Sequence, residues 1–226
     1  MSVSRFTFRP GGTSEVDIEA IMKAFDSTLI HLEKTGNGEQ WGTKSTAERE
    51  GYADGVKEDL EISEAWRMRG EGESKLVIMA EILDTSDAKD GLTRRVADDG
   101  TLRIQVGNME MYENCLSDHV ADHPDLQPSV DEVKSTPGGF LYINFLTSDF
   151  RAGNLSKGVG EAMIRYAQEY AKQRGMGALY LDAWIGGTRK LLEYYERLGF
   201  QKVVDFTFER KKTGGIWNGR VYKLAL

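Results

Sequence analysis

The sequence has little cysteine and no long apolar run. Cys115 is the one cysteine, so a disulfide within the chain is excluded and a reducing compartment is indicated. No apolar run approaches the length of a membrane span, and residues 1–12 lack the apolar core of a signal peptide. We therefore expect a cytoplasmic protein with no membrane partner.

Basic residues are outnumbered by acidic ones: 29 Lys and Arg against 36 Asp and Glu give a formal net charge of −7. This charge argues against a nucleic-acid-binding surface and suits a cationic amine as ligand. The 226 residues are 40% hydrophobic, which is enough for a sizeable core. No internal repeat or linker divides the chain, so we expect a single domain over residues 1–226.

The most informative stretch runs from Phe140 to Phe200. Its pattern predicts a strand, a polar loop, a helix with apolar positions three and four residues apart, a second strand and a second helix. Two consecutive strands joined by a helix run parallel, with a right-handed crossover. The five elements are expected at 140–147, 148–157, 158–174, 178–184 and 188–198.

The loop before the first of these helices can bind an anion. A helix N-terminus presents unpaired N–H groups and a partial positive charge, and Gly158 and Gly160 would let an anion approach the backbone. Lys157 adds a cation. The alternative is that the glycines only allow a tight turn. The pattern is neither a Walker loop nor a dinucleotide fingerprint, because no Gly-Lys-Ser/Thr follows and residue 163 is Met.

Three motifs in this stretch resemble the acetyl-CoA-binding part of the GNAT superfamily of N-acetyltransferases. They are the strand end Asn144-Phe145-Leu146-Thr147, the turn Gly158-Val159-Gly160, and Tyr194-Tyr195-Glu196-Arg197-Leu198-Gly199-Phe200. Together with the segments between them they cover about a quarter of the chain. The sequence departs from the family in having Leu155 where Gln or Arg is common, a loop about two residues longer, and no Asn before the last helix.

The resemblance implies a mixed α+β fold: a central, mostly antiparallel sheet with a parallel strand pair, flanked by helices. It implies acetyl-CoA as cosubstrate and N-acetyl transfer to the primary amine of a small molecule, by direct attack in a ternary complex. A monomer or homodimer is expected. The alternative is a non-catalytic module that binds acyl-CoA or another protein through the same fold.

The resemblance also implies which residues bind the cofactor. The pyrophosphate would contact the turn before the helix, and the pantetheine arm would pair with the end of the preceding strand as an added strand does. A backbone N–H near Leu146 or Thr147 would stabilise the oxyanion. The expected cofactor-binding residues are Phe145, Leu146, Thr147, Ser156, Lys157, Gly158, Val159 and Gly160.

Two residues are expected to be catalytic. Tyr195 matches the family position that protonates the leaving thiolate, although it could instead be a packed helix residue. Asp182 lies in an apolar strand, where a carboxylate is costly without a partner or a task, so it is a candidate for binding or deprotonating the amine.

Glu81 is a second candidate for contact with the substrate on the same reasoning. Trp41 is expected to border the acceptor pocket, or else to cover an edge of the core.

Residues 107–139 have the least readable pattern. Cys115, His119 and His123 are spaced by four, which would align three metal ligands on a helix. Pro124 follows at once and no second ligand cluster exists, so we expect no metal. Three of the four prolines lie in this segment, which favours a loop or a flap over the active site.

The other elements follow from ordinary periodicity. Ser14 is the expected N-cap of a helix, with Asp17 completing a capping box, and Ile18, Ile21, Phe25, Leu29 and Leu32 form its buried face. The further elements predicted are strands at 5–9, 76–83, 101–106, 201–208 and 216–226 and a helix at 46–69.

Overall fold

The structure is a computed structural model that describes residues 5–85, 90–210 and 215–226. These residues form two compact units. The first contains the described residues up to 31 together with 44–110 and 145–166, and the second contains 32–43, 111–144 and the described residues from 167 onward. The single domain expected from the sequence stays a prediction.

The first unit is built on antiparallel strands. β1 (Thr7–Pro10) pairs with β2 (Lys75–Leu83), and β3 (Arg94–Val96) pairs with β4 (Leu102–Glu113). The helices of this unit are α1 (Glu15–Lys34), the short η1 (Thr46–Glu48) and α2 (Tyr52–Arg69). Their apolar faces meet β2 in a core cluster of Ala20, Ile21, Val56, Leu60, Val77 and Met79.

Both helices of this unit begin for local reasons. Asp17 N donates to Ser14 Oγ at 3.3 Å, so Ser14 caps α1 as predicted. The predicted helix at 46–69 instead begins at Tyr52, because Gly51 has a left-handed φ of 69° and interrupts the helical path.

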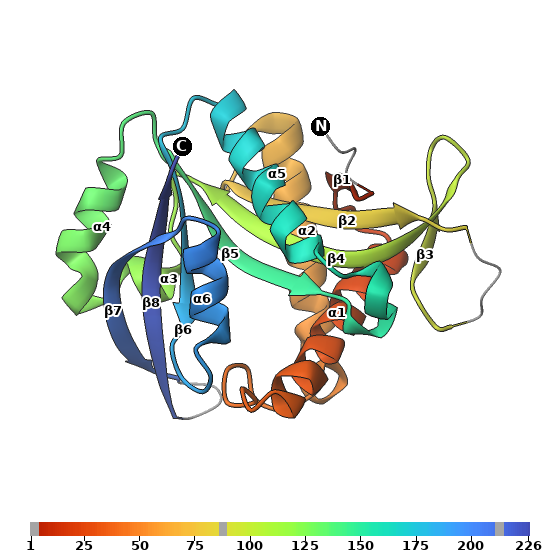
Figure 1. The fold of residues 1–226 in the computed structure, drawn as a ribbon. Helices are drawn as coiled ribbons and strands as arrows, with labels where there is room; N and C mark the ends of the chain where they lie inside the picture. The colour runs from red at the N-terminus through yellow and green to blue at the C-terminus, as the bar shows by residue number, and fades with distance from the viewer. Residues whose placement is uncertain (1–4, 86–89, 211–214) are drawn as a thin grey trace. The chain divides into compact units, whose positions relative to one another are not determined.

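The second unit contains the parallel strand pair. β5 (Phe140–Ser148) and β6 (Ala178–Trp184) are parallel, with Phe140–Ile143 paired to Ala178–Leu181. β8 (Ile216–Ala225) is antiparallel to β6, and β7 (Gln201–Glu209) is antiparallel to β8. Figure 1 shows α6 (Lys190–Arg197) in front of these strands. The predicted fold class is confirmed: strand pairs that are mostly antiparallel, one parallel pair, and flanking helices.

One helix follows the end of β5, as the sequence predicts. α5 spans Val159–Gln173, and Val159, Met163, Ile164 and Ala167 on its apolar face are almost fully buried. The expected loop before it contains a short 3₁₀ segment, η3 (Phe150–Leu155), which Asp149 caps by accepting from Arg151 N.

The structure differs from the loop or flap expected at 107–139. β4 continues to Glu113, and three helical segments follow: α3 (Asp118–Ala121), η2 (Pro124–Leu126) and α4 (Gln127–Lys134). Val120, Leu126, Val130 and Val133 are buried in a core cluster with Phe140 and Tyr180. Each helix is too short to show a clear period, and the buried part of β4 includes the polar residues Gln105, Asn108 and Glu113, so local pattern did not reveal these elements.

Within the described residues, none of the helices combines the length and the apolar character that crossing a membrane requires.

Candidate functional site

The turn before α5 has the geometry of an anion site. Gly158 has a φ of 86°, and a Cβ built on it would meet no atom within 4 Å, so the glycine is required by backbone conformation and faces open space. Val159 N donates to Ser156 O at 3.0 Å and closes the turn. Among the described residues, no acceptor is recorded for the N–H groups of Gly158, Gly160 and Glu161. These are the groups that a bound anion would satisfy.

Two cations border this turn. Lys157 is exposed. The guanidinium of Arg5 donates to the carbonyl oxygens of Asn154 at 3.0 Å and Lys157 at 2.6 Å. Sequence reasoning missed Arg5, because nothing local connects residue 5 to a turn about 150 residues later.

The end of β5 carries the other predicted cofactor contacts. The Phe145 ring lies 5.8 Å from that of Phe25, and Leu146 is half-buried. Thr147 is buried, and its hydroxyl has no hydrogen-bond partner among the described residues. The register with β6 ends at Ile143, and β5 continues to Ser148.

Tyr195 lies on α6 among other aromatic rings. Its ring centroid is 5.4 Å from Tyr194, 5.7 Å from Phe200 and 6.0 Å from Tyr222. No described residue forms a hydrogen bond with its hydroxyl. Burial, and then the charges of Tyr194, Asp182 and Tyr222, raise the pKa of Tyr195 above its ordinary value, so the phenol is protonated at neutral pH. A protonated phenol without a protein partner can donate to a ligand.

Asp182 belongs to a polar cluster in the second unit. It accepts a short hydrogen bond from the hydroxyl of Tyr142, which is also 3.0 Å from Ser117 Oγ. His119 Nε2 lies 3.3 Å from Asp182 Oδ1. Burial, and then the charge of Asp182, raise the pKa of Tyr142 well above its ordinary value, so this buried hydroxyl keeps its proton. The predicted cost of a carboxylate in this strand is therefore offset by hydrogen bonds.

The spacing of Cys115, His119 and His123 does not produce a shared site. His123 Nε2 is 2.8 Å from Thr207 O, whereas His119 contacts Asp182. Within the residues that the structure describes, no three His, Cys, Asp or Glu side chains are placed to hold a metal ion. The spacing was nevertheless the one local signal that pointed to His119.

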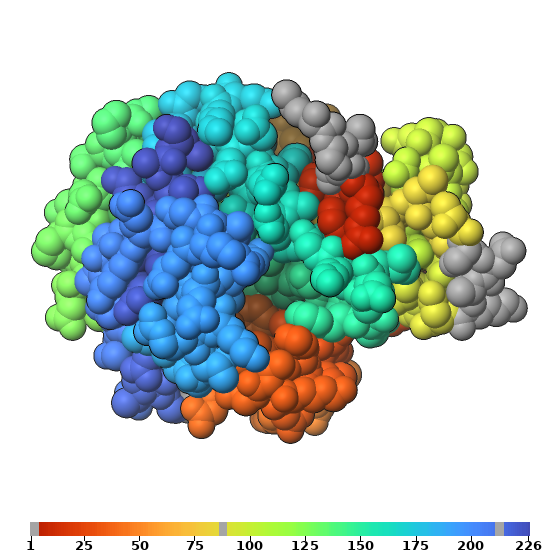
Figure 2. Space-filling model, viewed as in Figure 1, coloured from red at the N-terminus to blue at the C-terminus, as the bar shows by residue number. Residues whose placement is uncertain are grey.

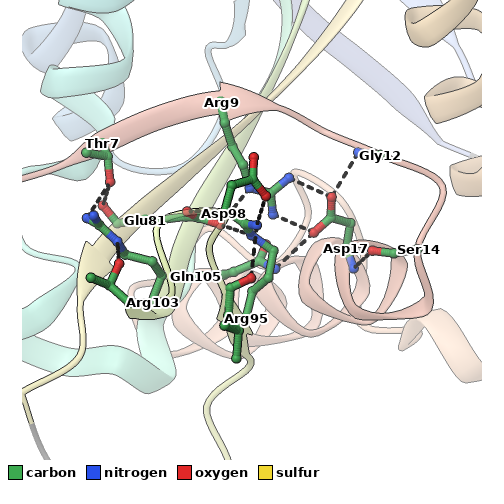
Figure 3. Close-up of polar contacts among 12 residues, drawn as sticks. Thr7, Arg9, Gly12, Ser14, Asp17, Glu81, Arg95, Asp98, Arg103 and Gln105 are labelled. Atoms are coloured by element: carbon green, nitrogen blue, oxygen red, sulfur yellow. Dashed lines mark hydrogen bonds and ion pairs between the residues drawn. The ribbon is translucent and has the colours of Figure 1, made fainter.

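Glu81 is enclosed by arginines in the first unit (Figure 3). Its Oε1 accepts from Arg9 at 2.7 Å and from Arg95 at 3.0 Å, and its Oε2 accepts from Arg95 at 3.3 Å. Arg9 also donates to both carboxylate oxygens of Asp17. The role of Glu81 in binding substrate stays a prediction, but these contacts leave little of its carboxylate for an amine.

Trp41 is half-buried in the second unit, in the segment that follows α1. Asn37 in the same segment accepts from Thr188 N at 3.0 Å, and Glu39 O accepts from Arg210 at 2.8 Å. The segment is thus hydrogen-bonded to a residue just before α6 and to a residue just after β7. Residues of α6 form part of the surface visible in Figure 2. Its contact with a substrate stays a prediction.

The predicted site residues fall into two groups. The first unit holds Phe145–Thr147, Ser156–Gly160 and Glu81, and the second holds Trp41, Asp182 and Tyr195. Within the second unit, Asp182 is near enough for its charge to influence Tyr195.

Comparison with known proteins agrees with this fold. No protein-family model matches the chain. An uncharacterized N-acetyltransferase of Methanocaldococcus jannaschii is 42% identical over 59 residues, which are 26% of this chain and 24% of the relative's length. The chain thus spans about a quarter of that curated relative.

Solved structures match over almost the whole chain. A GNAT-family acetyltransferase of Listeria monocytogenes has a TM-score of 0.53 at 16% identity, covering 98% of this chain and 95% of that one. A Salmonella typhimurium protein solved with its cofactor acetyl-CoA has a TM-score of 0.54 at 12% identity, covering 99% of this chain and 95% of that one. An Arabidopsis thaliana protein solved with a bisubstrate analogue has a TM-score of 0.55 at 13% identity, covering 98% of this chain and 99% of that one. The chain therefore has the fold of the GNAT acetyltransferases, and the predicted resemblance is confirmed in three dimensions.

Proposed function

We propose that this chain is an acetyl-CoA-dependent N-acetyltransferase acting on the primary amine of a small molecule. The observation that carries the proposal is the turn from Ser156 to Gly160, which places free N–H groups at the start of α5, the first α-helix after β5, in a GNAT fold. The net charge of −7 suits a cationic acceptor. We place the protein in the cytoplasm, as a monomer or homodimer.

The cofactor contacts follow from the first unit. The pyrophosphate of acetyl-CoA would accept hydrogen bonds from the backbone between Ser156 and Gly160, with Lys157 supplying positive charge. The pantetheine arm would pair with β5 from Phe145 to Thr147, which lies beyond the last residues paired with β6. A backbone N–H near Leu146 or Thr147 would stabilise the oxyanion that forms when the amine attacks the thioester carbonyl.

The second unit supplies the proton chemistry. Tyr195 would donate to the sulfur of CoA as the C–S bond breaks. The acceptor must lose a proton before it can attack, and we propose that Asp182 takes part in binding or deprotonating it. Trp41 would contact the acceptor. Glu81 is the less favoured acidic residue, because Arg9 and Arg95 occupy its oxygens.

Calorimetric titration of acetyl-CoA tests the proposal, with CoA as comparator, followed by thiol release with ethylamine, benzylamine, spermidine and amino-acid amides. We expect micromolar binding of acetyl-CoA and amine-dependent release of CoA. Binding without transfer to any amine would favour the non-catalytic acyl-CoA module. No binding up to millimolar concentrations would favour a protein-interaction module.

Replacing Gly158 with Ala is expected to raise the dissociation constant of acetyl-CoA about tenfold, equivalent to roughly 1.4 kcal/mol. The new Cβ would point into the open space that the pyrophosphate should occupy. The matched control is Gly70→Ala in the same unit, because Gly70 also has a positive φ, 67°, and open space around its Cβ. Both variants should lose similar stability, but only the first should lose affinity by calorimetry. Equal affinities in the two variants would remove the turn from the cofactor site.

A further inference from the structure

The polar cluster around Asp182 contains the imidazole of His119. His119 lies on α3, and its Nε2 is 3.3 Å from Asp182 Oδ1 and 3.5 Å from Ser117 Oγ. The cluster continues through the Tyr142 hydroxyl, which bonds to both Asp182 and Ser117. All four side chains belong to the second unit.

The contacts of His119 distinguish its two ring nitrogens, of which one can accept a proton from a substrate. Nε2 lies 3.3 Å from Asp182 Oδ1, and in the tautomer that carries the proton on Nε2 the lone pair is on Nδ1. Among the described residues, the polar contacts of His119 are made by Nε2 and none by Nδ1. Ring contacts with Phe206, at 6.3 Å, and Phe208, at 5.2 Å, restrict rotation of the imidazole. The result is an oriented imidazole with a carboxylate on one nitrogen and a free lone pair on the other.

The two members of this pair differ in accessibility. The Asp182 side chain is 7% exposed, whereas that of His119 is 33% exposed. Asp182 Oδ1 is shared between Tyr142 and His119. A substrate can therefore reach the imidazole more readily than the carboxylate, and the carboxylate can stabilise the imidazolium that proton transfer would create.

We propose that His119 is the base that removes the proton from the acceptor ammonium, and that Asp182 is the positioning residue that orients it. The inference rests on the proposed function. One ammonium proton moves to His119 Nδ1, and the neutral nitrogen then attacks the thioester carbonyl carbon. The C–N bond forms and the C–S bond breaks. The nitrogen loses its second proton as the amide forms, which balances the proton that CoA sulfur gains, and His119 releases its proton to water.

The base and the proposed acid then belong to one unit. Asp182 is close enough to Tyr195 to be among the causes of its raised pKa. Tyr195 is the residue that the proposed function assigns to the leaving sulfur.

The test uses the fastest amine of the panel described above. His119→Gln is expected to lower kcat about 100-fold or more while leaving the acetyl-CoA dissociation constant unchanged. The matched control is His123→Gln, an imidazole of the same segment that bonds to the carbonyl of Thr207 and should retain full activity. In His119→Ala, added imidazole should restore activity, which a structural role would not permit. Asp182→Asn should lose about tenfold in kcat without imidazole rescue, because only orientation is lost.

The outcomes separate this inference from the proposed function. A wild-type protein that acetylates no amine of the panel overturns the proposed function itself. An active wild type with an equally active His119→Gln variant overturns the inference alone. An inactive Asp182→Asn variant together with an active His119→Gln variant also overturns the inference, because the carboxylate would then be the base. Loss of activity in His119→Ala without rescue assigns His119 a structural role and also overturns the inference.

Discussion

Tyr195→Phe should lower kcat roughly 100- to 1,000-fold with little change in the dissociation constant of acetyl-CoA. The substitution keeps the ring contacts with Phe200 and Tyr222 and removes only the hydroxyl. The leaving thiolate would then lack its donor. Steady-state kinetics and calorimetry on the same preparation would separate these two effects.

The raised pKa of Tyr195 refines its expected role. An ordinary thiol has a pKa of about 8.5, so a phenol whose pKa is raised above 10.0 is the weaker acid. Tyr195 should therefore stabilise the developing thiolate by a hydrogen bond more than by complete proton transfer. Tyr194→Phe, the same change at the preceding residue of α6, is the control and should leave kcat unchanged. Equal kcat values for the two variants would remove Tyr195 from the mechanism.

Asp17→Ala should lower the free energy of unfolding by about 3–5 kcal/mol. Asp17 is 2% exposed and accepts hydrogen bonds from Arg9, from Gly12 N at 2.8 Å and from Gln105 at 3.0 Å. Figure 3 shows these groups converging on its carboxylate. Without the carboxylate, a guanidinium that is 20% exposed loses a buried partner and two further donors lose their acceptor. Urea unfolding measures the loss.

The control for this change is Glu19→Ala on the same helix. Glu19 pairs with Lys23, but the two side chains are 53% and 41% exposed, so the loss should be below about 0.5 kcal/mol. Losses of equal size in the two variants would show that the buried cluster contributes no more than a surface ion pair.

The pH dependence of stability should report the same cluster. Burial by itself would raise the pKa of Asp17, but hydrogen bonds from Arg9 and Gly12, and the charge of Arg9, bring it below its ordinary value. The resulting stabilisation is present above the unfolded pKa, about 3.9, and is lost as pH falls through the lower folded pKa. The wild type should therefore lose stability below about pH 4, and Asp17→Ala should lose less over the same range.

Local sequence determined the elements that carry the proposed cofactor contacts. The strands at β5 and β6, their parallel pairing, and α5 with Gly158 before it follow from the spacing of apolar residues and from glycine position. The GNAT resemblance rests on these same local motifs. They were predictable because a helix period or a strand run depends on neighbouring residues alone.

Tertiary structure decided which polar side chains meet. Asp17 was predicted to be part of a capping box, yet its carboxylate accepts hydrogen bonds from Arg9. Glu81 was expected to contact a substrate, and its carboxylate instead binds Arg9 and Arg95. His119 meets Asp182, which lies 63 positions later in the chain. The sequence by itself therefore determined the local elements on which the proposed cofactor site rests, because these elements depend on local conformation. Only the folded chain decided which carboxylates remain free for chemistry, because a charged group pairs with whatever partner packing brings to it, however distant in sequence.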